Sequence, residues 1–296
     1  MKTKRFLPKQ PMIRRALHKL FPAASAVSSL LSKGEPVIVP AVTEAGFSIA
    51  IQCWSLKEFT LFEAIEMAAA AGAGGVELYP GQRLGGSHGD LVFSENLPDA
   101  TLLAVIDHLE INHIAAVNLG VVDVPEDETK ARKLFDLAKK LKLHSITTES
   151  ANAIDTLEKL SQEYDLKVCF HNHPKPTALW HPDTVSKLLE GRHENLGFCA
   201  DIGHWASSGL DPLEVVKNIA PRIRSFHLKD RDSVSEWTHD RPFGTGIIDL
   251  PSILDVACQH GFAGNVTIEY EHNWQTNLSE IAQCAGYLRA YAKMRQ

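Results

Sequence analysis

Cysteine is scarce in this chain and follows no metal-binding or disulfide pattern. The 296 residues include five cysteines, namely Cys53, Cys169, Cys199, Cys258 and Cys284. Their number is odd and no two of them stand in a CxxC spacing. The cysteines therefore disfavour both a structural zinc site and a disulfide framework.

Positive charge is also scarce beyond the first residues. The net charge is −6, and no long basic block follows the N-terminal segment. Because nucleic acids are bound by clustered Lys and Arg, we expect no nucleic-acid partner. No apolar run is long enough to span a bilayer, so we expect no membrane partner. With 44% hydrophobic and 22% charged residues, the composition is that of an ordinary globular protein.

Residues 1–45 differ from the rest of the chain. Residues 1–20 carry seven Lys or Arg and no acid, and the first acidic residue is Glu35. Small and apolar residues follow in LFPAASAVSSLL, and VPA at 39–41 resembles a cleavage site. This layout fits an export signal and fits a disordered basic extension equally well. We expect an exported, periplasmic protein in the first case and a cytoplasmic one in the second.

From residue 47 onward, short β-rich segments alternate with helical segments. Eight strands are predicted, each followed by a helix, at 47–54, 75–80, 113–120, 143–150, 167–174, 196–201, 223–230 and 265–271. Such alternation implies parallel strands with helical crossovers, and eight units close into a barrel. An open doubly wound sheet is the second interpretation, but no GxGxxG follows the first strand. We predict one α/β domain over residues 46–296, a (β/α)8 TIM barrel.

Polar side chains stand at the C-terminal ends of the predicted strands. From the second strand to the eighth they are Glu77, Asn118, Glu149, His171 with His173, Asp201, His227, and Glu269 with Glu271. In a (β/α)8 barrel these ends open on one face, where active sites lie. Residues two apart share a face of a strand, so Cys199 points the same way as Asp201. We expect small residues to fill the interior of the barrel and the acids and imidazoles to lie at its C-terminal mouth.

Several carboxylates and imidazoles around one mouth require a counter-charge. A divalent cation supplies it, and this mixture of ligands suits Mn²⁺, Zn²⁺, Co²⁺ or Mg²⁺. A single strand-end acid more often caps a helix, and a lone His227 in an apolar strand is usually a bonded core residue. The pattern over consecutive strands is what favours a site. Histidines elsewhere, among them His144, are expected to face solvent.

Several segments resemble a known family. ADIGHW, RIRSFHLKD, PFGTGIIDLPSIL and GNVTIEYE, in that order, are similar to the xylose isomerase-like TIM barrel superfamily of sugar phosphate isomerases and epimerases. QCWSLKEFTLFEAIEMA with GVELYPGQ resembles its first βαβ unit, and the resemblance runs from about Phe47 to the C-terminus. It implies one divalent metal, Mn²⁺ by preference, held by two Glu, one Asp and one His. Matched by motif, three of these ligands are Asp201, His227 and Glu269.

The fourth ligand departs from the family pattern. Many epimerases take a glutamate from the end of the fifth strand, where this chain has His171 in FHNHP. We assign Glu149, from the neighbouring strand, as the fourth ligand. His171 is the alternative ligand, or it binds substrate together with His173. The resemblance also implies substrate contacts for His204 and Lys229, and further pocket candidates are Gln52, Trp54, Glu77, Trp205 and Trp237.

The resemblance implies proton transfer next to a carbonyl through a metal-bound enediolate. Glu149 and Glu269, on opposite sides of a small-molecule sugar or sugar derivative, would serve as base and acid. We therefore predict a divalent-metal-dependent sugar isomerase or epimerase. A lyase or dehydratase acting on a keto-sugar or keto-inositol shares the intermediate and is the first alternative. In that case His173 or His204 would protonate the leaving group.

Two other classes remain as lesser alternatives. An abasic-site endonuclease of the superfamily would need several metals and histidines on the second and third strands, where this chain has Glu77 and Asn118. A non-catalytic sugar-binding barrel would need no metal. PFGTGIIDL could bind phosphate, although one Gly-x-Gly is weak support and a loop over the mouth explains it equally well. Phosphorylation of the substrate and homo-oligomer formation are both left open.

Overall fold

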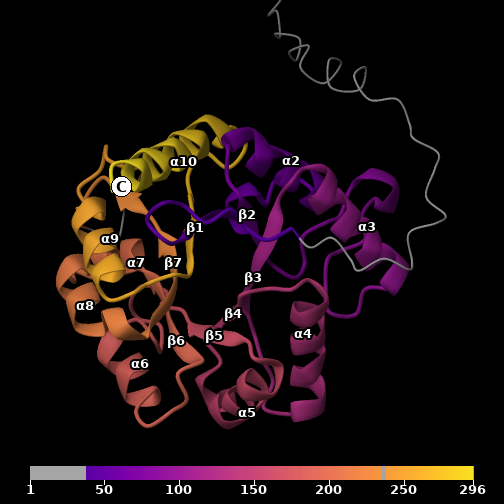
Figure 1. Ribbon diagram of the computed structural model, residues 1–296, viewed down its shortest axis with the longest axis horizontal. Helices are drawn as coiled ribbons and strands as arrows, with labels where there is room; N and C mark the ends of the chain where they lie inside the picture. Colours follow the sequence, from indigo (N-terminus) through magenta and orange to yellow (C-terminus); the bar gives the residue numbers. More distant parts are fainter. Residues whose placement is uncertain (1–37, 235–237, 296) are drawn as a thin grey trace, which may run out of the picture. The chain divides into compact units, whose positions relative to one another are not determined.

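The computed structural model describes residues 38–234 and 238–295. In this part of the chain, parallel strands form a closed barrel in the order β1-β10-β7-β6-β5-β4-β3-β2, which confirms the predicted (β/α)8 fold (Figure 1). The barrel strands are β1 (Ser48–Gln52), β2 (Gly75–Leu78), β3 (Ala115–Val122), β4 (Ser145–Thr148), β5 (Lys167–Phe170), β6 (Leu196–Asp201), β7 (Ile223–Leu228) and β10 (Asn265–Ile268).

Helices surround the barrel between successive strands (Figure 1). They are α2 (Leu61–Ala71), α3 (Asp99–Ile111), α4 (Glu128–Lys140), α5 (Ile154–Tyr164), α6 (Pro182–Leu188), α7 (Ile202–Ser207), α8 (Pro212–Ile219), α9 (Leu250–Gln259) and α10 (Leu278–Lys293). Two features were not predicted. One is α7, which starts directly after β6, and the other is an antiparallel pair of two-residue strands, β8 (Asp230–Arg231) and β9 (Asp240–Arg241).

Local sequence explains where the helices begin and end. At the start of α2 the Thr60 side chain accepts from the Glu63 amide, and the Glu63 carboxylate accepts from the Thr60 amide. This capping box satisfies amides that have no partner inside the helix. Gly72 ends the helix at φ 81°, a left-handed conformation that glycine adopts at little cost.

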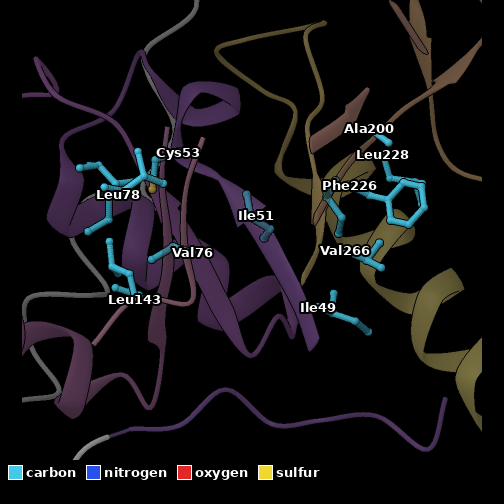
Figure 2. Close-up of a cluster of buried hydrophobic side chains, with 14 of the residues drawn as sticks. Ile49, Ile51, Cys53, Val76, Leu78, Leu143, Ala200, Phe226, Leu228 and Val266 are labelled. Carbon is cyan, nitrogen blue, oxygen red and sulfur yellow. The ribbon is translucent and has the colours of Figure 1, made fainter. Parts of the chain in front are cut away.

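The two faces of the barrel strands carry different side chains. Large apolar residues point outward into the main core between strands and helices, among them Ile49, Ile51, Val76, Leu78, Phe226 and Leu228 (Figure 2). The inward positions are mostly small or polar and buried, including Ser48, Ser145, Thr147, Cys169, Cys199, Ser225 and Thr267. A small inner apolar cluster of Ala50, Ala115 and Val117 packs against Ile38. The barrel therefore has a polar interior that leads up to the mouth.

His144 corrects one prediction, because it is half-buried and not a solvent-facing side chain. It immediately precedes β4, and its backbone amide donates to the Val117 carbonyl at 2.8 Å. Its Nδ1 atom is buried and has no hydrogen-bond partner. Burial, reinforced by the positive charges of Lys167 and Arg224, lowers the pKa of His144 to about 4.

Most of the predicted N-terminal extension, residues 1–45, lies outside the described residues, and so does Trp237. The part that is described leads into the barrel, where the Thr43 amide donates to the Phe47 carbonyl at 2.9 Å. Among residues 38–234 and 238–295, no helix combines the length and the apolar character that crossing a membrane requires.

Candidate functional site

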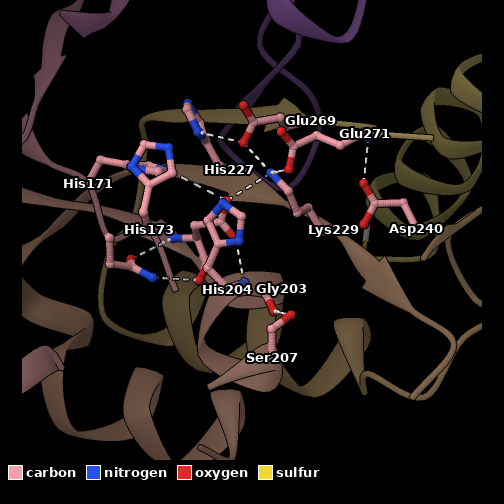
Figure 3. Close-up of polar contacts among 12 residues, drawn as sticks. His171, His173, Gly203, His204, Ser207, His227, Lys229, Asp240, Glu269 and Glu271 are labelled. Atoms are coloured by element: carbon pink, nitrogen blue, oxygen red, sulfur yellow. Dashed lines mark hydrogen bonds and ion pairs between the residues drawn. The ribbon is translucent and has the colours of Figure 1, made fainter. Parts of the chain in front are cut away.

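Four side chains that lie at the ends of β6 and β7 or directly after β5 and β10 meet at the mouth of the barrel. One ligand atom from each of His171, Asp201, His227 and Glu269 lies within 4.8 Å of the others, and all four residues are buried. Figure 3 shows His171, His227 and Glu269 directed toward a common centre. Asp201, His227 and Glu269 are three of the residues that the sequence analysis proposed as ligands. We refer to these four residues as the mouth cluster.

The mouth cluster has the donor atoms that a divalent cation needs. His171 Nε2 and His227 Nδ1 are buried nitrogens without a hydrogen-bond partner. His171 Nε2 lies 3.5 Å from Asp201 Oδ2, and His227 Nδ1 lies 3.0 Å from Glu269 Oε2. Two imidazoles and two carboxylates form a donor set that suits Mn²⁺, Zn²⁺ or a similar divalent ion.

The second ring nitrogen of each clustered histidine contacts another carboxylate. His171 Nδ1 lies 2.9 Å from Glu149 Oε1, and His227 Nε2 lies 3.0 Å from Glu77 Oε1. Since a carboxylate only accepts, each of these nitrogens carries the proton. Metal-binding histidines are commonly held in this way, because the outer hydrogen bond fixes both the tautomer and the ring orientation. The structure therefore leaves His171 Nε2 and His227 Nδ1 facing the mouth cluster.

Glu149 lies beside the mouth cluster in a second group, with His171 and His173. Its Oε1 atom lies 2.6 Å from His173 Nδ1 and also accepts from the His173 amide at 2.8 Å. Burial alone would raise the pKa of Glu149, but the hydrogen bonds from the two imidazoles outweigh it and hold the pKa well below its ordinary value. This carboxylate is ionised and engaged by two histidines.

Lys229 is fully buried among the carboxylates of the mouth. Its Nζ atom lies 2.9 Å from Asp201 Oδ2, in a short contact with Glu269 Oε2, and 3.4 Å from Glu271 Oε2 (Figure 3). Burial opposes the charge, but Asp201 and Glu269 raise the pKa of Lys229 well above its ordinary value. The ammonium thus offsets the negative charge of the mouth cluster.

His204 lies in α7 with both ring nitrogens near polar groups. Its backbone amide donates to Asp201 Oδ1 at 2.8 Å, so Asp201 also caps this helix. Nε2 lies 3.4 Å from Asp201 Oδ2, and Nδ1 lies 3.4 Å from Arg231 Nη2. Burial lowers the pKa of His204 well below its ordinary value, and Lys229 adds to the effect against the opposing charge of Asp201. His204 is therefore neutral.

Several residues that support the site were not predicted from the sequence. Asn172 holds the backbone of Asp201, donating to its carbonyl at 2.9 Å and accepting from its amide at 3.1 Å. Arg231, beside His204, pairs with Asp240 at 2.9 Å, and the Asp240 side chain accepts from the Glu271 amide at 2.5 Å. Asn172 stands between two proposed site histidines, which could have drawn attention to it. Two-residue strands carry no periodicity that could reveal Arg231 or Asp240.

Several predicted substrate-binding residues have structural contacts of their own. The Gln52 side chain donates to the Gly120 carbonyl at 3.0 Å and accepts from the Trp54 amide at 3.2 Å. Glu77 is fully buried, and its Oε2 atom accepts from Asn118 Nδ2 at 3.3 Å. Trp205 is fully buried in α7, whereas Trp54 is 39% exposed. Of these residues, Trp54 is the one most accessible to a ligand.

The amides of the PFGTGIIDL segment are occupied by an internal carboxylate. Asp230 accepts from the amides of Gly244 at 3.0 Å, Gly246 at 2.9 Å and Ile248 at 3.1 Å. Backbone amides of a glycine-rich loop are the groups that would bind a phosphate. Here they bind Asp230, so these three amides are not free to bind a phosphate.

Comparisons with known proteins identify relatives of this chain. The chain is 29% identical over 139 residues to an inosose dehydratase of Clostridium perfringens, covering 42% of this chain and 46% of that protein. It is 27% identical over 205 residues to an inosose dehydratase of Histophilus somni, covering 61% and 67%. The chain thus spans about half the length of the first of these relatives.

A solved structure and a family model cover more of the chain. An uncharacterised protein of Parabacteroides distasonis superposes with a TM-score of 0.68 at 29% identity, covering 83% of this chain and 99% of that one. The model of the xylose isomerase-like TIM barrel family matches residues 65–291. That range includes the mouth cluster, Glu149, Lys229 and the Asp230 loop. The chain therefore belongs to the xylose isomerase-like TIM barrel family.

Proposed function

We propose that this protein is a divalent-metal-dependent dehydratase that removes water from a keto-cyclitol or keto-sugar. A dehydratase is a lyase, which was the first alternative to the sugar isomerase or epimerase predicted from the sequence. The names of the two inosose dehydratases are consistent with it. The observation that supports a dehydratase over an epimerase is the set of contacts that Glu149 makes.

Epimerisation by a carboxylate pair requires one of Glu149 and Glu269 to remove a proton from one face of the substrate. The other must then donate a proton to the opposite face. Glu149 Oε1 is instead bonded to His171 and to His173. A carboxylate held by two imidazoles is a poor acceptor for a carbon-bound proton. The same contact orients His173, and the His173 side chain is 47% exposed at the mouth. An imidazole paired with a carboxylate is a common general acid and base.

We assign the metal ligands as His171, Asp201, His227 and Glu269, with Glu149 as the carboxylate that orients His171. A bound divalent ion supplies Lewis acidity toward the carbonyl oxygen of the substrate. His173 Nε2 takes the proton from the carbon next to the carbonyl. His173 then returns this proton to the hydroxyl on the following carbon, which leaves as water. One imidazole serves both steps, so we expect loss of hydrogen and hydroxyl from the same face.

The substrate in this proposal carries no phosphate. Asp230 already occupies the loop amides that would bind one, and Lys229 is committed to three carboxylates. A polyhydroxylated ring fits the remaining polar groups of the mouth better than a phosphate does.

The test is NMR of 2-keto-myo-inositol incubated with the Mn²⁺-loaded and Zn²⁺-loaded protein in D₂O. We expect net loss of water, and a loss of rate of about 10²–10⁴-fold in His173→Ala, the range of a general acid or base. His260→Ala, which changes an exposed histidine, is the matched control and should keep full activity. Deuterium incorporation without loss of water would instead identify an isomerase or epimerase.

A further inference from the structure

Three aromatic side chains at the rim take no part in the chemistry described above. Trp54 follows β1, Tyr79 follows β2, and Trp274 lies in the segment between β10 and α10. The Trp54 ring stands edge-on to both of the others, with centroid distances of 5.2 Å to Tyr79 and 6.5 Å to Trp274. Because β1 lies between β2 and β10 in the barrel, these rings form one patch.

The faces of the two indoles are covered by a lysine. The Lys57 ammonium lies 4.4 Å from the centroid of the Trp54 ring and 3.6 Å from that of Trp274. A cation is attracted to the negative face of an aromatic ring by about 0.5–1 kcal/mol at an exposed site. Such an interaction is weak enough for a ligand to displace. A ligand that displaces Lys57 would therefore reach the indole faces and would have a hydrogen-bond donor beside it.

Buried hydrogen bonds hold the patch in place. Ser55, next to Trp54, has an Oγ atom that accepts from the Tyr270 amide at 2.7 Å and a carbonyl that accepts from Asn277 Nδ2 at 2.8 Å. Tyr270 and Asn277 flank the segment that carries Trp274. These two bonds fasten that segment to the Trp54 turn. A prearranged surface loses less entropy when a ligand binds.

The patch lies across the mouth from the proposed acid and base. In the closed order of eight strands, β1 stands opposite β5, which precedes His173. Tyr79 follows Glu77 by two residues, roughly 7 Å farther along the direction of β2. A ring that reacts at His173 therefore fills the centre of the mouth, and the patch lies beyond it.

We propose that Trp54, Tyr79 and Trp274 form a subsite for a second pyranose ring. The preferred substrate is then a two-ring keto-glycoside, with the reacting ring at the mouth cluster and the second ring on the patch. The C–H face of the second ring packs on the indoles, and its hydroxyls accept from Lys57. This inference rests on the proposed function for the position of the reacting ring.

The experiment measures binding, independently of turnover. Isothermal titration of the metal-loaded full-length protein compares methyl β-D-glucopyranoside with cellobiose, maltose, lactose and trehalose. We expect at least one disaccharide to bind about tenfold more tightly than the one-ring glycoside, the size of effect that packing on aromatic rings gives. Trp274→Ala should abolish this preference, and Trp274→Phe should keep most of it. Trp180→Ala is the control, because Trp180 also has a lysine, Lys175, over its ring, at 4.7 Å.

Two results would overturn the subsite. One is that no disaccharide binds the wild-type protein more tightly than the one-ring glycoside. The other is that Trp274→Ala retains the preference while its melting temperature stays near the wild-type value. A disaccharide preference without any dehydration would support the subsite and contradict the proposed function. Dehydration of one-ring ketones without a disaccharide preference would support the proposed function and contradict the subsite.

Discussion

His227 Nε2 donates a hydrogen bond to Glu77 Oε1 at 3.0 Å, across 150 positions of sequence. Both side chains are fully buried. Glu77 is held in turn by Asn118, whose Oδ1 atom accepts from Ser145 Oγ and, at 3.0 Å, from Asn265 Nδ2. A chain of hydrogen bonds inside the barrel therefore sets the orientation of an imidazole at its mouth.

Glu77→Gln should weaken binding of Mn²⁺ and Zn²⁺ by about 10–100-fold, the usual cost of losing the outer partner of a metal-binding histidine. The barrel should remain folded, because glutamine has nearly the same shape. Affinity is measured by competition with a chelator. Glu126→Gln, an exposed change, should leave affinity unaltered. Equal affinities in both variants would show that Glu77 does not position His227.

Asp201→Asn should abolish metal binding with little effect on folding. The amide oxygen can still accept from the His204 amide and cap α7, but one of the two carboxylates that would hold the cation is gone. Elemental analysis should find the purified variant nearly free of metal, and added Mn²⁺ should no longer raise its melting temperature. Asp183→Asn, with a side chain that is 76% exposed, serves as the control. Full metal occupancy in Asp201→Asn would show that the site is misplaced.

Asp230→Asn should loosen the loop that PFGTGIIDL forms. The carboxylate accepts from three loop amides, and an asparagine would turn an N–H group toward some of them. Leaving buried donors unsatisfied costs about 1–3 kcal/mol, which urea denaturation would measure. Hydrogen exchange should accelerate selectively in residues 242–249. Asp90→Asn, an exposed change, should alter neither quantity.

Stability should fall as the pH drops from about 6.5 to about 4, in part because of His144. The pKa of His144 is lowered from an ordinary 6.5 to about 4 in the folded protein, so between these values only the unfolded chain takes up the proton. The loss is on the order of 2–3 kcal/mol. Unfolding measured in urea at several pH values would show it, and His144→Leu should have a flatter profile over this window. Identical profiles would contradict the proposed role of His144.

Much of the fold could be predicted because its elements are periodic and regularly spaced. The meeting of Asp201, His227 and Glu269 could also be predicted, since the ends of parallel barrel strands open on one face. The different positions of Glu149 and His171 relative to the mouth cluster could not be predicted. Each follows its strand by one residue, and Thr148 pairs with Phe170, so the two stand at the same height. Side-chain direction alone separates them.

The remaining omissions have a similar origin. The six residues of α7 are too few to show helical periodicity, and their start depends on the side chain of Asp201. The Arg231–Asp240 pair joins two-residue strands whose existence depends on tertiary contacts. The members of the aromatic patch come from three segments that are far apart in the sequence. Such features come from three-dimensional packing, which a local pattern does not record.

If the protein binds a metal as proposed, Lys229 affects how the chain folds before that metal is bound. With its ammonium between Asp201 and Glu269, the newly made chain has an internal counter-ion and need not wait for an outside one to fold. Folding of the chain and binding of the proposed metal can then occur at different times. We expect a cell short of metal to accumulate a reserve of intact, inactive protein that a later supply can activate without new synthesis.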